Sequence, residues 1–179
     1  MHTIQQRLKK GDTIFGIDPG SRSCGFACIM ARTATPYQPK DFQLIDMGVL
    51  ELSPKQPFAI RIQQLRQAIH LLVESLSPSY AAMETAFLGV NPYSALKLGE
   101  IRGMCSGIFS ASQIPLGEIA PNSVKKRITG HGHASKALVS EVLKQHFFEQ
   151  IPDLPFDATD ALAIALSYGL EVNFYKMSR

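Results

Sequence analysis

The first regular pattern in the chain is a short apolar run that ends at an acid and is followed by a turn. The apolar run Thr13–Asp18 is followed by Pro19-Gly20 and by a second apolar run that extends to about Ala31. Short apolar runs separated by turn residues predict two paired strands. A third predicted strand, Phe42–Leu52, completes an antiparallel meander. Asp-Pro-Gly is also an ordinary turn sequence, so this pattern alone gives Asp18 no chemical role.

The apolar spacing then changes from strand-like to helical. Apolar residues recur every three or four positions over residues 58–76, which predicts an amphipathic helix with one buried stripe. The short apolar segment 80–86 follows, with Glu84 as its single acid. A helix between two strands is typical of a βαβ crossover, so this strand is expected to run parallel to a neighbour. If that neighbour is the first strand, Glu84 lies at the same sheet edge as Asp18.

The second half of the chain combines one more strand with helices. Asn91 and Pro92 are a typical N-cap and first-turn pair and predict the start of a helix. The pattern predicts a strand over residues 114–120 and helices over residues 93–111, 121–127, 134–147 and from Asp157 onward. We therefore expect an α/β fold, with a mixed five-stranded sheet flanked by helices. It forms a single domain over residues 1–179, with a polar N-terminal extension over residues 1–12.

The predicted helix 93–111 carries a series of small residues. They recur every four positions and form a smooth ridge along one side, at Ala95, Gly99, Gly103, Gly107 and Ala111. Each interior glycine costs about 1 kcal/mol of helix stability relative to alanine, so close packing has to compensate. The packing partner is either the sheet or a second copy of the same helix across a two-fold axis.

The composition indicates the cellular location of the protein more than its chemistry. The chain has 179 residues, of which 45% are hydrophobic and 18% charged, as is typical of globular proteins. No apolar run approaches the roughly 20 residues of a membrane span, and the N-terminus lacks the apolar core of a secretory signal. Cys24, Cys28 and Cys105 lie in apolar segments and are odd in number. Reduced core thiols explain them better than disulfides, so a cytoplasmic location without membrane contact is predicted.

Charge is distributed unevenly along the chain. The net charge is +3, but residues 121–147 contain five Lys or Arg residues and one acid, which gives a local charge of +4. The rest of the chain therefore sums to −1. A basic segment on an otherwise balanced protein indicates a polyanionic partner, although a solvated face is the more ordinary explanation.

Four acids are the candidate chemistry, and three distant segments contribute them. Asp18 and Glu84 end predicted strands, while Asp157 and Asp160 share one face of the last helix, where helix capping would also explain them. Four carboxylates at one sheet edge repel one another unless divalent cations offset their charge. Two Mg²⁺ ions at roughly 3.5 to 4 Å fit such a set, with Mn²⁺ as an alternative, and support phosphodiester hydrolysis. Asp18, on the most rigid strand, is expected to bridge both ions.

Four motifs resemble those of the RuvC family of Holliday-junction resolvases. They are GIDPGSRSCGFACI at residues 16–29, METAFLGVNPYSALKLGEIRG at 83–103, Gly-x-Gly-x-Ala-x-Lys at 130–136 and DATDALAIAL at 157–166. Their order and spacing match the family from Ile14 to Tyr168. The first motif is weak by itself because sugar kinases and actin-like ATPases share it, whereas the four motifs together are highly specific.

The resemblance implies a ribonuclease H-like fold, a homodimer and Mg²⁺-dependent paired cleavage of a four-way DNA junction in recombination and repair. It also implies a branch-migration complex of the RuvA and RuvB type as partner. Phe87 corresponds to an aromatic residue that meets bases at the junction centre, and Lys125 and Lys136 correspond to basic residues near the scissile backbone. The resemblance assigns metal binding and catalysis to Asp18, Glu84, Asp157 and Asp160.

One departure from the family pattern bears on DNA binding, and two other functions stay open. Val90 stands where a lysine is expected, which puts one phosphate contact in question. The acids determine the chemistry but not the substrate, so a ribonuclease H-like nuclease that acts on RNA or other branched DNA is one alternative. A catalytically inactive junction-binding protein is the other, and the presence of all four acids argues against it.

Overall fold

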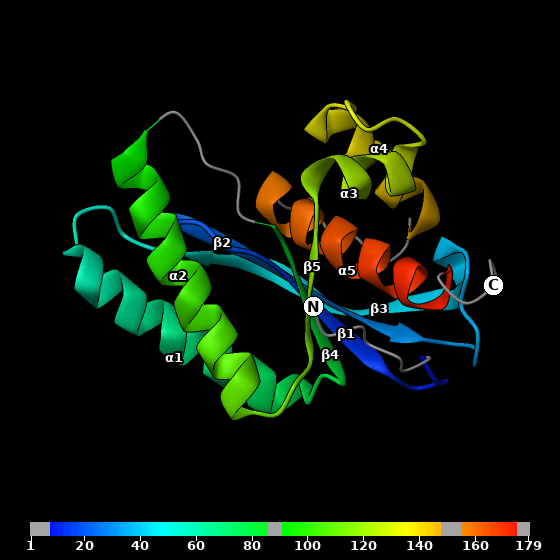
Figure 1. Ribbon diagram of the computed structural model, residues 1–179, viewed down its shortest axis with the longest axis horizontal. Helices are drawn as coiled ribbons and strands as arrows, with labels where there is room; N and C mark the ends of the chain where they lie inside the picture. Colours follow the sequence, from blue (N-terminus) through cyan, green and yellow to red (C-terminus); the bar gives the residue numbers. More distant parts are fainter. Residues whose placement is uncertain (1–7, 86–90, 148–154, 175–179) are drawn as a thin grey trace.

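The computed structural model describes residues 8–85, 91–147 and 155–174, which form one sheet covered by helices (Figure 1). The strands are β1 (Thr13–Asp18), β2 (Ser23–Ala31), β3 (Phe42–Glu51), β4 (Tyr80–Glu84) and β5 (Leu116–Ile119). The α-helices are α1 (Phe58–Leu76), α2 (Pro92–Ala111), α3 (Pro121–Thr129), α4 (Lys136–His146) and α5 (Phe156–Phe174). A short 3₁₀ helix, Pro39–Asp41, precedes β3.

The sheet is mixed, with the strand order β3-β2-β1-β4-β5. β1 pairs antiparallel with β2, and β2 with β3, so the predicted meander is confirmed. β4 runs parallel to β1 on its other side, and β5 runs parallel to β4. Because Ile17 lies opposite Met83 in the parallel register, the next residues, Asp18 and Glu84, reach the same edge of the sheet.

Helices cover both faces of this sheet. α5 lies across one face with α3 and α4 beside it, and α1 and α2 cover the other face (Figure 1). The side chains of β1 alternate between the two hydrophobic cores, with Ile14 in the core on the α5 side and Phe15 and Ile17 in the core on the other side. Leu8, within the N-terminal extension predicted to be polar, is buried in the α5-side core.

Two glycines let α5 approach the sheet closely. A Cβ on Gly16 of β1 would lie 2.2 Å from the carbonyl oxygen of Ala161. A Cβ on Gly25 of β2 would lie 1.9 Å from the carbonyl oxygen of Asp157. Side chains at these two positions would push the helix away, so the glycines bring the first turns of α5 to the ends of β1 and β2.

Most element boundaries agree with the sequence predictions. Asn91 caps α2 as predicted, because its Oδ1 accepts hydrogen bonds from the backbone N–H of Tyr93 at 3.0 Å and of Ser94 at 3.3 Å. β5 is shorter than the predicted strand, and α3 continues to Thr129, where Gly130 ends it with a φ of +80°.

Among the described residues, no helix is both long and apolar enough to span a bilayer.

The ridge of small residues on α2 does not pack on the sheet. α2 faces the core with Ile101, Cys105 and Phe109, whereas its glycines are exposed. Within the described part of the chain, no other group lies within 4 Å of a Cβ placed on Gly99, Gly103 or Gly107. The alternative in which the sheet compensates for the helical glycines is therefore wrong for this chain.

Candidate active site

Strand alternation places Asp18 and Glu84 on the face of the sheet that α5 covers. In β1, Gly16 faces α5, so Asp18 two residues later faces the same side. In β4, Ala82 belongs to the α5-side core, so Glu84 follows on that side as well. Asp18 and Glu84 thus lie on the same face, at the same end of adjacent parallel strands.

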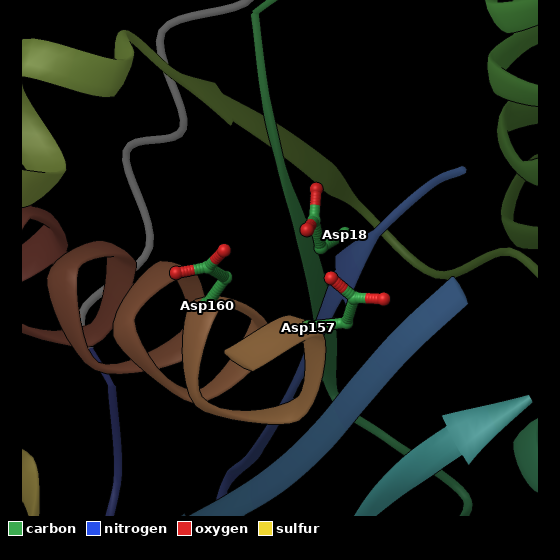
Figure 2. A group of neighbouring side chains, drawn as sticks. All are labelled: Asp18, Asp157 and Asp160. Carbon is green, nitrogen blue, oxygen red and sulfur yellow. The ribbon is translucent and has the colours of Figure 1, made fainter. Parts of the chain in front are cut away.

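The first turns of α5 bring two further acids to this edge. Asp157 and Asp160 are both partly buried, and they lie one helical turn apart. One carboxylate oxygen from each of Asp18, Asp157 and Asp160 lies within 4.8 Å of the others. Figure 2 shows the three side chains at this edge, Asp18 from the end of β1 and the other two from the start of α5. The structure therefore brings together three of the four acids that the sequence indicates.

Glu84 lies outside that group of three but borders the same pocket. The pocket has a volume of about 190 Å³, and its ionisable lining consists of Asp18, Glu84, Asp160, Lys125 and Lys136. Burial raises the pKa of the Glu84 carboxyl, and the negative charge of Asp160 raises it further. Lys136, Lys125 and Arg102 act in the opposite direction without cancelling the effect. Glu84 thus lines the pocket, where burial and the charge of Asp160 disfavour its ionised form.

Asp18 has a strongly raised pKa. Burial is the main cause, the carboxylates of Asp160 and Glu84 add to it, and together they raise its pKa from 3.8 to about 7. The positive charge of Lys136 lowers the pKa but does not offset these effects. A second or third cation in the pocket would relieve this repulsion, and hard carboxylate oxygens are the donors that Mg²⁺ and Mn²⁺ prefer. The donor set therefore fits a divalent metal site.

Lys136, at the start of α4, is the basic residue in direct contact with the acids. Its Nζ donates a hydrogen bond to Oδ2 of Asp160, and more than half of its side chain is exposed. Partial burial lowers the pKa of this ammonium group, but the hydrogen bond and the charge of Asp160 outweigh burial and raise it. Lys125 of α3 is partly buried and lines the same pocket.

The basic segment does not act as one surface. Arg127 turns toward α5, where its guanidinium donates to the carbonyl oxygen of Ser167 at 2.8 Å and to the Glu171 carboxylate at 2.9 Å. The charge of Arg127 is therefore paired with Glu171 within the protein, whereas Lys125 and Lys136 line the acidic pocket. Phe87 and Val90 lie outside the described residues, so the predicted place of Phe87 at the junction centre and the missing phosphate contact at Val90 stay predictions.

Comparison with known proteins connects this pocket to one enzyme class. Residues 14–168 match the family model described as crossover junction endodeoxyribonuclease RuvC. A protein of that name from Cytophaga hutchinsonii is 36% identical over 167 residues, which cover 93% of this chain and 80% of that protein. The chain belongs to the RuvC family. Membership confirms the resemblance found in the four motifs and establishes the class, a crossover junction endodeoxyribonuclease of DNA recombination and repair.

Solved structures agree with the RuvC assignment at the level of the fold. RuvC of T. thermophilus, solved in complex with a Holliday junction substrate, superposes with a TM-score of 0.81 at 24% identity and covers 92% of this chain and 96% of that one. The yeast mitochondrial Holliday junction resolvase Ydc2 gives a TM-score of 0.66 at 14% identity, with 96% and 84% covered. The predicted ribonuclease H-like fold is therefore confirmed.

Two supporting contacts of this RuvC-family site were not predicted. Ser23 of β2 donates a hydrogen bond from Oγ to Oδ2 of Asp157. Arg102 of α2 donates to the backbone carbonyl of Glu84 and, at 2.5 Å, to Oε1 of Glu118, which fixes the end of β4 against β5. Neither residue stands out in the sequence, because each acts on an acid that is distant along the chain.

Proposed function

We propose that this RuvC-family chain hydrolyses phosphodiester bonds of four-way DNA junctions at a divalent-metal site. The convergence of three aspartates from β1 and α5 beside an acid-lined pocket is the observation that supports it. The residues that would hold two Mg²⁺ ions, or Mn²⁺ in their place, are Asp18, Glu84, Asp157 and Asp160. Such ions activate water and stabilise the leaving oxygen in an in-line displacement at phosphorus.

The protein's own residues have separate tasks in this proposal. Asp18 lies on a strand that pairs with β4 and is covered by α5, so it would be the acid to share its carboxylate between two ions. Lys125 and Lys136 carry the positive charge that attracts the DNA phosphate to the pocket. Binding that depends on phosphate contacts weakens steeply with salt concentration. Phe87 is proposed to stack on bases at the junction centre, where each stacked base contributes about 1–3 kcal/mol.

Paired cuts require two sites related by symmetry, and we assign the dimer contact to α2. The support is the exposed ridge at Gly99, Gly103 and Gly107, together with the exposed side chains of Tyr93 and Leu96 on the same helix. Helical glycines without a packing partner among the described residues are costly, and a second copy of α2 would compensate.

The cellular setting follows from the same proposal. A branch-migration complex of the RuvA and RuvB type would deliver the junction, and the reaction would take place in the cytoplasm. The three cysteines are unpaired and buried, as expected in a reducing compartment.

Replacing Asp18 tests the metal site. Asp18→Asn removes a ligand while keeping size and polarity, so cleavage is expected to fall by more than the roughly 100-fold that loss of an outer-shell partner costs. Junction binding, measured by gel shift in EDTA, is expected to persist because the lysines are unchanged. The control is Asp46→Asn on the distant part of β3, which is expected to cleave like the original chain. Full activity of Asp18→Asn would remove Asp18 from the site.

A further inference from the structure

Asp157 is held by a neighbour on β2 that belongs to none of the motif roles. Ser23 and Asp157 are 134 positions apart, and the hydroxyl of Ser23 donates to Oδ2 of Asp157. A hydroxyl has one proton to donate, so it serves one oxygen of the carboxylate. The second oxygen of Asp157 receives no hydrogen bond from Ser23, and one oxygen of Asp157 lies within 4.8 Å of an oxygen of Asp18 and an oxygen of Asp160.

The backbone around Ser23 leaves this serine little freedom. A Cβ on Gly20 would lie 2.2 Å from the carbonyl oxygen of Ser23, so the turn after Asp18 folds tightly against the start of β2. Two residues after Ser23, the backbone of Gly25 contacts the carbonyl group of Asp157 so closely that a Cβ there would overlap it. Ser23 is therefore fixed between Asp18, which precedes the turn, and Asp157, which lies above the strand.

Arg61 of α1 fixes the same turn from the opposite side. It is buried, with 9% of its surface exposed, and its guanidinium donates to the carbonyl oxygen of Ser21. The guanidinium carbon lies 5.3 Å from the ring centre of Phe58, and no acid of the described residues forms an ion pair with it. The backbone N–H of Leu52 donates to the carbonyl of Arg22 at 2.8 Å. The turn is thus held at two successive residues immediately before Ser23.

We propose that Ser23 is a positioning residue that orients the Asp157 carboxylate for divalent-ion binding. The inference rests on the proposed metal role of Asp157 and adds the group that aims it. A hydrogen bond to one carboxylate oxygen fixes the rotation of the group, so less conformational freedom is lost when an ion binds to the other oxygen. Outer-shell partners of metal ligands typically contribute 10- to 100-fold to metal affinity or activity.

Mn²⁺ binding to the purified chain, measured by isothermal titration calorimetry without DNA, tests this role. Ser23→Ala is expected to bind Mn²⁺ about 10-fold more weakly than the original chain. Ser23→Thr, which keeps the hydroxyl, is expected to stay within about 3-fold, and Ser53→Ala, an exposed serine in the loop after β3, is expected to be unchanged. In cleavage assays, Ser23→Ala is expected to need about 10-fold more Mg²⁺ for half-maximal rate and to recover most of its rate at saturation.

Three outcomes separate the inference from the proposed function. Equal Mn²⁺ affinity of Ser23→Ala and the original chain would overturn the positioning role while leaving the metal site in place. Weakened binding in Ser23→Thr as large as in Ser23→Ala would overturn it too, because the hydroxyl would not be the active group. If the original chain binds no Mn²⁺ while folded by circular dichroism, the proposed metal site itself fails, and the role of Ser23 fails with it.

Discussion

Asp18 combines two properties that rarely coexist in a folded protein. It is a partly buried acid whose nearest charged neighbours include further acids, and its pKa rises to about 7 as a result. The position of Asp18 at the end of β1 could be derived from the strand pattern, whereas its convergence with Asp157 and Asp160 was a hypothesis that the resemblance to the RuvC family supported. The hydrogen bond from Ser23 to Asp157 could not be predicted, because it joins residues of β2 and α5 whose approach depends on Gly25.

The raised pKa of Asp18 predicts how stability depends on pH in the absence of metal. Between the ordinary value of 3.8 and about 7, the folded state binds more protons than the unfolded state, so the free energy of unfolding falls as pH rises. The pKa of Glu84 is also raised, which acts in the same direction. In EDTA, the melting temperature is therefore expected to be lower at pH 8 than at pH 5, and excess Mg²⁺ at pH 8 is expected to restore it.

Asp18→Asn is the control for this pH dependence. The amide does not ionise, so the variant is expected to melt higher than the original chain at pH 8 in EDTA and to show a shallower loss of stability from pH 5 to pH 8. An unchanged slope in the variant would show that Asp18 does not carry the effect.

At the scale of elements, α2 shows what a sequence pattern can and cannot establish. The spacing of Gly99, Gly103 and Gly107 predicts a ridge, and the ridge exists. Whether it faces the sheet depends on which residues of α2 enter the core, and Ile101, Cys105 and Phe109 do so instead. A count of charges along the chain has the same limit. The basic segment 121–147 includes Arg127, but the guanidinium of Arg127 pairs with Glu171 on α5 and does not face the pocket.

A leucine on the ridge tests the dimer contact. Gly103→Leu is expected to favour the helix by about 1 kcal/mol within one chain, because glycine is a poor helix former. If the ridge packs against a second copy, the added side chain separates the helices, and sedimentation velocity at micromolar concentration is expected to change from dimer to monomer. Gln145→Leu, which adds the same side chain on an exposed position of α4, is expected to stay dimeric. A monomeric original chain, or a dimeric Gly103→Leu chain, would contradict the assignment.

At the scale of the whole molecule, local patterns were sufficient for most of the fold. Apolar runs and helical spacing identified five strands and their helices, and the crossover rule predicted that β4 runs parallel to a neighbour, which the structure shows to be β1. The position of α5 depends on close contacts at Gly16 and Gly25 that no periodicity reveals. For the site, the pattern named the four acids, while the separation of Glu84 from the other three is a property of the packed structure.

The cleavage pattern on a synthetic four-way junction tests the account most directly. Each strand carries its own label, and linear duplex and RNA–DNA hybrid of the same sequence are the matched substrates. With Mg²⁺, the chain is expected to make paired nicks at symmetric positions in two opposing strands and to leave the other substrates intact, and EDTA is expected to abolish the nicks. Equal cutting of linear duplex or hybrid, or an intact junction in the presence of Mg²⁺, would contradict the account.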